Sequence, residues 1–145
     1  RVVSHNHPYY LSVLAALGVL PDLVHQTGAL FLDDMHLVPT YDGEIDAPWR
    51  AAELAKDVGS ANMILLANHG VIITGANLAE AVYRAASIER VCKHASDVML
   101  TGRTPSAMNR GDLSGMKASL IERAADVYWA GAARMTIKAD RGVLD

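Results

Sequence analysis

Three histidines carry the clearest chemical signal in this sequence. His5 and His7 follow Val2-Val3, a β-branched pair that favours a strand. Side chains two residues apart on a strand lie on the same face, with their Cα atoms about 7 Å apart. Both imidazoles can therefore reach a single ion, while Asn6 points the other way. Two ligands do not make a stable metal site, and His69 is the best candidate for the third.

His69 lies between two unbroken apolar runs of strand length, Met63–Ala67 and Val71–Thr74. Asn68-His69-Gly70 therefore predicts a sharp bend between paired strands. A polar Asn-His pair is costly to bury without partners, which favours a metal-binding role for His69. The alternatives are a solvent-facing histidine at the tip of a hairpin and, for His-x-His, a surface pair. Three neutral imidazoles that leave one position open are typical of a catalytic zinc site, because structural sites are closed by four protein ligands.

Periodicity and end signals predict the elements that position these histidines. Helices are expected over residues 8–17, 48–58, 78–100 and 113–138. Residues 101–112 are rich in Gly, Pro, Ser and Asn and should form a loop. Val38–Tyr41 is expected as a short edge strand, because Pro39 cannot donate to a ladder. A turn should follow at Asp42-Gly43, whereas residues 21–37 show no clear pattern.

Two of these helices affect the expected site. The first begins one residue after His7, so its N-terminal amides and positive dipole end should lie near the three histidines. That placement favours an anionic ligand or substrate group. On the outer side of the long third helix, Glu80 and Arg84 have the i,i+4 spacing of a stabilising ion pair. Glu89 and Lys93 repeat this spacing.

Length and charge limit the class of protein. At 145 residues, of which 51% are hydrophobic, the chain fits one domain with an ample core. The net charge of −3 and the lack of a Lys/Arg cluster argue against a nucleic-acid partner. No apolar run is long enough to span a bilayer, and there is no secretory signal. The chain opens without methionine inside an expected strand, which indicates that an N-terminal part is missing.

The remaining reactive side chains are expected to be less important for chemistry. The single cysteine, Cys92, excludes an internal disulfide and suits a reducing compartment, so we expect a cytoplasmic protein. Cys92 lies on the inner side of the long helix and should be a core residue, not a nucleophile. His25 and His36 are expected at the surface or behind the ligands, and His94 in solvent. The sequence has no Gly-rich phosphate loop, Gly-x-Ser-x-Gly or His-Glu-x-x-His motif.

Several segments, in this order and separation, resemble the class II aldolase/adducin family, which includes fuculose-phosphate and rhamnulose-phosphate aldolases and ribulose-phosphate 4-epimerase. These segments are Val3–Tyr10 before a helix, Val38–Tyr41, Leu65–Val71 with Gly75, and Glu80-Ala81 with Glu89 in a long helix. The resemblance covers about Val2–Leu100, and the tail after Thr101 matches poorly. It implies that residues 1–145 are one such domain lacking its N-terminal part.

The resemblance implies an α/β fold with three layers, α/β/α, around a mostly antiparallel mixed sheet. It also implies a divalent metal bound by His5, His7 and His69. Zn²⁺ is the expected ion, with Mn²⁺, Fe²⁺ and Co²⁺ as alternatives. Family members bind a small hydroxy-carbonyl or hydroxy-acid substrate on the metal, which stabilises the enolate left when a carbon–carbon bond next to the carbonyl breaks.

The resemblance therefore implies a metal-dependent lyase of the aldolase or decarboxylase type. The alternatives are an epimerase or dehydratase on the same scaffold, and a non-catalytic interaction module like adducin. Family members are homotetramers with sites between subunits, so we expect a homo-oligomer. The last helix agrees with this, because it carries Tyr128, Trp129 and Met135 outside its inner stripe.

Two departures from the family pattern bear on mechanism. The family's catalytic carboxylate and phosphate loops lie upstream of His-x-His, so the general base is expected upstream of Arg1. Asp33, Asp34 and Glu44 do not match its motif. Sugar-phosphate aldolases also place a tyrosine shortly after the first helix, where this sequence has His25. That difference argues against a sugar-phosphate substrate and favours decarboxylation as the alternative to aldol cleavage.

Overall fold

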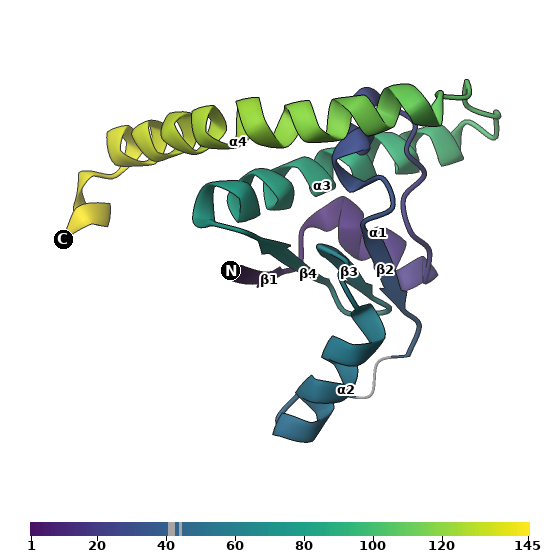
Figure 1. The fold of residues 1–145 in the computed structure, drawn as a ribbon, viewed down its shortest axis with the longest axis horizontal. Helices are drawn as coiled ribbons and strands as arrows, with labels where there is room; N and C mark the ends of the chain where they lie inside the picture. Colours follow the sequence, from purple (N-terminus) through teal and green to yellow (C-terminus); the bar gives the residue numbers. More distant parts are fainter. Residues whose placement is uncertain (41–42, 44) are drawn as a thin grey trace.

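The computed structural model describes residues 1–40, 43 and 45–145, and it shows a sheet with helices on both faces (Figure 1). The elements, in chain order, are β1 Val2–Asn6, α1 Tyr9–Leu17, the 3-10 helix η1 Gln26–Phe31, β2 Met35–Val38, α2 Pro48–Val58, β3 Met63–Leu66, β4 Val71–Gly75, α3 Leu78–Leu100, α4 Arg110–Ala139 and the 3-10 helix η2 Arg141–Leu144. This architecture confirms the predicted α/β class.

The sheet has four strands in the order β1-β4-β3-β2. β4 pairs antiparallel with both β1 and β3, whereas β2 pairs parallel with β3. In this register His5 lies opposite Ile72, and Asn6 lies opposite Val71. The end of β1 therefore meets the beginning of β4, which follows His69 and Gly70 directly. Pairing of these two strands brings together histidines that are more than sixty residues apart in the sequence.

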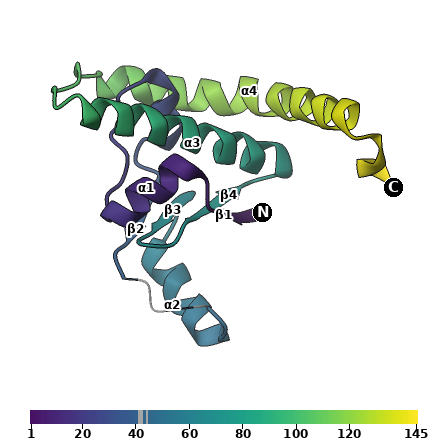
Figure 2. The same ribbon diagram turned by 180° about the vertical axis from the view of Figure 1, so that it is seen from behind.

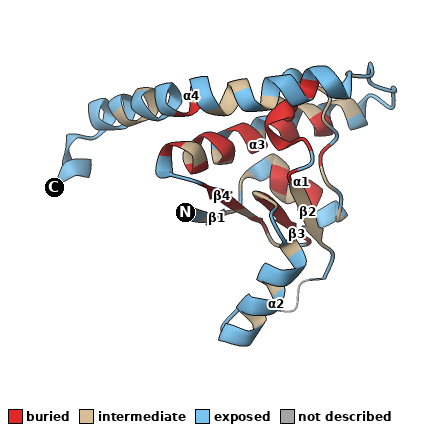
Figure 3. Cartoon of the chain, viewed as in Figure 1, coloured by how far each residue is buried: buried red, intermediate tan, exposed pale blue. Residues whose placement is uncertain are grey.

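The core fills the space between one face of the sheet and the helices α1 and α3. Its fully buried side chains include Leu11 and Leu14 of α1, Met63, Leu65, Val71 and Ile73 of the sheet, and Ile88 and Cys92 of α3. α4 packs across α3 and η1 and continues beyond them, as the view from behind shows (Figure 2). Its C-terminal half and α2, on the other side of the sheet, are mostly exposed (Figure 3).

Several local predictions are confirmed. α2 and α3 begin and end where their periodicity predicts, and α1 ends at Gly18, whose φ of 63° is the left-handed conformation of a helix stop. Asn77 caps α3, because its side chain accepts a hydrogen bond from the backbone of Glu80 at 2.8 Å. In the described part of the chain, no helix combines the length and apolarity that crossing a membrane requires.

Two boundaries differ from the prediction. The strand expected at Val38–Tyr41 lies earlier, at β2, because its parallel pairing with β3 begins at Met35. Tyr41 and Asp42, and with them most of the expected turn, lie outside the described residues. The loop expected over 101–112 ends at Asn109, since the Asn109 side chain accepts hydrogen bonds from the backbone of the next helical residues and starts α4 at Arg110. The last helix thus covers more than the predicted 113–138.

Of the two ion pairs expected on the outer side of α3, one forms and one does not. Arg84 does pair with Glu80, at 2.9 Å, but it is buried, because it also reaches Asp34 at 2.9 Å. The pair between Glu89 and Lys93 does not form: Lys93 instead donates to Asp97 at 3.1 Å and to the Tyr10 hydroxyl at 2.9 Å. Glu89 binds the backbone of α1.

Candidate metal centre

His5 lies in β1 and His7 directly follows its last residue, Asn6, and the two side chains project onto the same side of the chain. The Nε2 atoms of the two imidazoles are 2.9 Å apart, and both residues are exposed. The period-two geometry of a strand thus does what the sequence predicts. A hydrogen bond also fixes the other ring nitrogen of His5, because Nδ1 lies 2.9 Å from the carbonyl oxygen of Val71 on the paired strand β4. A carbonyl only accepts, so Nδ1 carries the proton and Nε2 keeps its lone pair for a ligand bond.

His69 lies in the tight turn between β3 and β4. Asn68 takes a left-handed conformation, with φ of 58°, and its amide donates to the carbonyl of Ala15 at the end of α1, at 2.9 Å. The turn is closed at both sides by Leu66, whose N–H donates to Gly70 at 2.8 Å and whose carbonyl accepts from His69 at 3.1 Å. The bend is therefore fixed by the backbone, and it leaves the His69 side chain half-buried beside β1.

Gly70 makes room for the third imidazole. A Cβ atom at this position would collide with the ring of His7 and would lie 2.7 Å from the carbonyl oxygen of Asn6. Any other residue would therefore push the end of β1 away from the turn. The glycine that follows His69 is needed because the strand carrying His5 and His7 passes directly over it.

The three imidazoles form one cluster. Each offers a ring nitrogen, and these nitrogens all lie within 4.8 Å of one another, with ring centroids 4.8 to 4.9 Å apart. Nitrogens that share one tetrahedral ion through bonds of about 2.0–2.1 Å lie about 3.3 Å from one another. The Nε2 atoms of His5 and His7, 2.9 Å apart, are already near this spacing. The donor set therefore fits a divalent transition-metal ion, with the exposed side of the cluster left for a further ligand.

The electrostatics of the cluster favour metal binding over protonation. Burial lowers the pKa of His69, and the neighbouring His5 and His7 lower it further. An imidazole whose pKa is lowered stays neutral near pH 7, and only the neutral form binds a metal.

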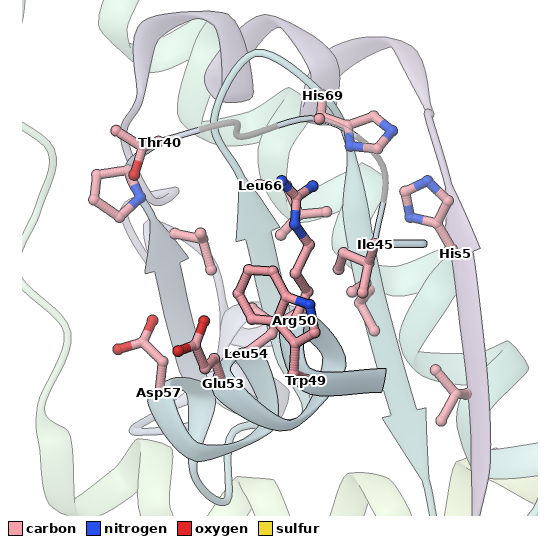
Figure 4. A pocket seen from close by; sticks show the side chains of 15 residues that line it. His5, Thr40, Ile45, Trp49, Arg50, Glu53, Leu54, Asp57, Leu66 and His69 are labelled. Atoms are coloured by element: carbon pink, nitrogen blue, oxygen red, sulfur yellow. The ribbon is translucent and has the colours of Figure 1, made fainter. Parts of the chain in front are cut away.

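A cavity of about 830 Å³ opens next to the cluster, between the outer face of the sheet and α2. His5 and His69 lie at one end of it, and the guanidinium of Arg50 points along it toward His69 (Figure 4). Arg50 also lies 5.5 Å from the ring of Trp49. The rest of the wall is mainly apolar and includes Val3, Val38, Leu54, Leu66 and Ile72, but the carboxylates of Glu53 and Asp57 also line it (Figure 4). Sequence reasoning did not find this cavity, because α2 and the sheet meet only in three dimensions.

Two of the N-terminal amides of α1, those of Tyr10 and Leu11, bind another part of the chain and are not available to a substrate, contrary to expectation. The backbone N–H groups of Tyr10 and Leu11 donate to the two carboxylate oxygens of Glu89, at 2.9 and 3.0 Å. The anion that the helix dipole favours at this place is thus supplied by α3.

The other residues considered for chemistry lie in structural contacts. Asp33 binds the exposed Arg110, and Asp34 is buried against Arg84, while Glu44 lies outside the described residues. His36 pairs with Asp57 at 3.0 Å.

The prediction of a solvated His94 is wrong, since this side chain is half-buried against the ring of His25, with centroids 4.8 Å apart. Among the described residues, only the three clustered histidines form a group suited to a metal ion.

Comparison with known proteins identifies the family. Residues 1–96 match the family described as Class II Aldolase and Adducin N-terminal domain, and the chain belongs to this family. The Meiotically up-regulated gene 14 protein of Schizosaccharomyces pombe is 28% identical over 91 residues, which are 63% of this chain and 35% of that protein.

Solved structures share the fold at low sequence identity. An aldolase II superfamily protein from Pseudomonas syringae superimposes with a TM-score of 0.75 at 18% identity, over 95% of this chain and 57% of that one. L-fuculose 1-phosphate aldolase from Glaciozyma antarctica PI12 gives a TM-score of 0.73 at 18% identity, over 97% and 52%. The chain therefore spans between about a third and somewhat more than half of the length of these relatives.

Proposed function

We propose that this chain holds the metal centre of a metal-dependent lyase, which cleaves a carbon–carbon bond next to a carbonyl by aldol cleavage or decarboxylation. The observation that carries the proposal is the convergence of His5, His7 and His69 on one exposed point beside a cavity. Membership of the class II aldolase and adducin family supports the same chemistry, because aldolases of this class typically use a divalent metal.

The three imidazoles would hold the ion, and Zn²⁺ is the ion we expect from an all-nitrogen donor set. When bound, such an ion acts as a Lewis acid that polarises a carbonyl oxygen and stabilises negative charge developing there. The chain itself keeps the ligands ready. The Val71 carbonyl fixes the tautomer of His5, burial keeps His69 neutral, and Gly70 lets the ring of His7 approach the turn.

The cavity supports a small hydroxy-carbonyl or hydroxy-acid substrate. Its mainly apolar walls suit the carbon skeleton of such a compound. The general base is not assigned to this chain, because Asp33 and Asp34 are held in structural ion pairs. We therefore propose that the 145-residue chain binds metal but has little activity alone.

We also propose that the protein works as a homotetramer in the cytoplasm, with no nucleic-acid or membrane partner. Exposed apolar side chains on α4 support self-association, among them Val127, with 70% of its surface exposed, and Met135, with 75%. The chain has a single cysteine, which supports a reducing compartment.

A bidentate metal-binding probe tests this function without knowledge of the substrate. Glycolohydroxamate presents two oxygens in the way that a hydroxy-carbonyl compound does. Calorimetry should detect its binding to the zinc-loaded chain, and chelation of the metal or His69→Ala should abolish this binding. Equal binding to the metal-free chain would contradict the proposal. Zinc uptake without any hydroxamate binding would favour a non-catalytic module like adducin over a lyase, epimerase or dehydratase.

A further inference from the structure

The helix that follows the metal-binding strand has no N-terminal cap from its own sequence. α1 begins after Pro8, which is the N-cap residue but has no side-chain hydrogen bond to offer, and the first turn contains no acidic residue. The first N–H groups of a helix lack intrahelical acceptors and must find partners elsewhere. In this chain the partner comes from a residue about eighty positions away in the sequence.

Glu89, in the middle of α3, supplies two of the missing acceptors. Its Oε1 accepts from the N–H of Tyr10 at 2.9 Å, and its Oε2 accepts from the N–H of Leu11 at 3.0 Å. Both contacts are charge-assisted and lie at the positive end of the α1 dipole, so they are stronger than neutral hydrogen bonds of the same length. Because both carboxylate oxygens accept a hydrogen bond, they also fix the rotation of the first turn about the α1 axis, which one hydrogen bond would not do.

A second contact from α3 falls on the same turn. Lys93, one turn after Glu89, donates to the Tyr10 hydroxyl at 2.9 Å, and its Nζ lies 4.5 Å from the centre of the Tyr10 ring. The hydrogen bond to Tyr10 is the largest cause of the raised pKa of Lys93. Lys93 is exposed, so this contact contributes less to stability than the partly buried contacts of Glu89.

The first turn of α1 is separated from His7 by Pro8 alone. The φ of Pro8 is −68°, a value that the proline ring enforces, so the direction of α1 is transmitted to the backbone of His7. His5 has a hydrogen bond from its rear nitrogen to the Val71 carbonyl. For His7, the described residues show no such bond, and its ring is placed by its own backbone and by contact with Gly70.

We propose that Glu89 is a positioning residue for the metal centre: by holding the first turn of α1 against α3, it sets the direction from which His7 approaches the other two imidazoles. The inference rests on the proposed metal site. α3 follows β4 in the chain, and β4 follows His69, so the same helix is connected to the third imidazole through one strand. Glu89 acts through the backbone of α1, and no contact between it and the ion is invoked.

Cobalt binding to the full chain tests this inference. Co²⁺ reports its coordination through its visible absorption spectrum, and its affinity can be measured by titration. Glu89→Ala should remain folded by circular dichroism, bind Co²⁺ about tenfold or more weakly, and show an altered spectrum, as changes behind a metal ligand usually do. Glu89→Gln, which keeps an acceptor oxygen, should be intermediate. Asp126→Ala, which removes an exposed carboxylate of α4, should match the unmodified chain.

The outcomes separate this inference from the proposed function. An unmodified chain that takes up no Co²⁺ would overturn the metal site, and the inference with it. A chain that binds Co²⁺ equally well with Glu89, Ala or Gln at this position, with an unchanged spectrum, would overturn the inference alone. If Glu89→Ala fails to fold, Glu89→Gln decides: unchanged affinity and spectrum in this folded variant would likewise overturn it.

Discussion

Gly70 is the residue at which the metal centre leaves no space for a side chain. The ring of His7 and the carbonyl oxygen of Asn6 occupy the volume that a Cβ would need. Gly70→Ala should therefore lower the free energy of unfolding by about 1–3 kcal/mol, as overpacking does. The same change should weaken Co²⁺ binding, since the His7 ring must move. Urea unfolding and cobalt titration measure the two effects.

A matched glycine provides the control for this prediction. Gly115 lies in α4, and a Cβ built on it meets no atom within 4 Å. Gly115→Ala should leave Co²⁺ binding unchanged and should leave stability equal or raise it by up to about 1 kcal/mol, because alanine is the better helix former. Gly70→Ala behaving like this control would show that the close approach of His7 to the turn is not required.

Cys92 should be an inert core residue. Burial, with a smaller effect from Glu89, raises the pKa of its thiol to about 12. At pH 8 the native protein should not react with dithionitrobenzoate, whereas the unfolded chain should release one equivalent of thionitrobenzoate. Above the pKa of about 8.5 of an unfolded thiol, the unfolded state loses a proton that the native state keeps. The free energy of unfolding should therefore fall with rising pH, by about 1.4 kcal/mol per unit from this residue.

Comparison with Cys92→Ala isolates that contribution, because the variant lacks the thiol in both states. Its free energy of unfolding should decline less steeply between about pH 9 and pH 11 than that of the unmodified chain. Rapid modification of the native thiol at pH 8, or an identical slope in the variant, would show that Cys92 is accessible to solvent.

At the scale of elements, a buried charge network connects α3 with α4 and with the segment before β2. Arg84 is only 2% exposed and binds Glu80 and Asp34, each at 2.9 Å. Asp34 also accepts from Lys117 of α4 at 3.2 Å and from the side chain of Asn62 at 2.9 Å. Asp34→Ala should cost about 3 kcal/mol in the free energy of unfolding, because it leaves Arg84 buried with one partner fewer.

The neighbouring Asp33 is the control for burial. Its bidentate pair with Arg110 is short, at 2.6 and 2.7 Å, but both side chains are exposed. Because Asp33 itself has a left-handed backbone with φ of 54°, the control variant is Arg110→Ala, which should cost less than about 1 kcal/mol. Similar costs for Arg110→Ala and Asp34→Ala in chemical denaturation would indicate that the Asp34 network is solvated in the native protein.

The elements whose signals are local were predictable from sequence. α2 and α3 match their predicted bounds because periodicity, a proline at the start of α2 and the Asn77 cap of α3 all lie within the segment itself. The His69 turn was predictable for the same reason, since two apolar runs flank a short polar segment. The cluster of three histidines could be anticipated because strand periodicity places two of them, and a paired strand brings the third.

The features that were missed depend on contacts between distant segments. β2 begins at Met35 because its parallel pairing with β3 begins there. No turn signal in the sequence near Met35 predicts this start. The spacing of Glu89 and Lys93 is that of a helical pair, but the uncapped end of α1 is a better partner for Glu89. The sequence also cannot show that Arg84 is buried, because the i,i+4 pattern is the same on either face of a helix.

At the scale of the whole molecule, α4 is longer than the body that it covers (Figure 1). Its C-terminal half exposes Val127, Trp129 and Met135 to solvent, with 70%, 37% and 75% of their surfaces accessible. Such groups cost free energy in water, so we expect another copy to cover them. Light scattering at micromolar concentration should give a tetramer, and the double variant Val127→Asp, Met135→Asp should give a smaller species.

Leu100 serves as the control, since it is 86% exposed at the end of α3, far from the C-terminal half of α4. Leu100→Asp should keep the mass of the unmodified assembly. A monomeric unmodified chain, or a double variant of unchanged mass, would show that α4 does not mediate self-association.

The most direct test of the proposed site is the metal content of the folded chain. After dialysis against zinc and then against metal-free buffer, elemental analysis should find about one zinc ion per chain. Replacement of His5, His7 or His69 by alanine should remove it, whereas His36→Ala, which only breaks a pair with Asp57, should retain it. A chain that is folded by circular dichroism yet holds no metal, or that keeps a full equivalent after loss of a clustered histidine, would contradict the proposed metal centre.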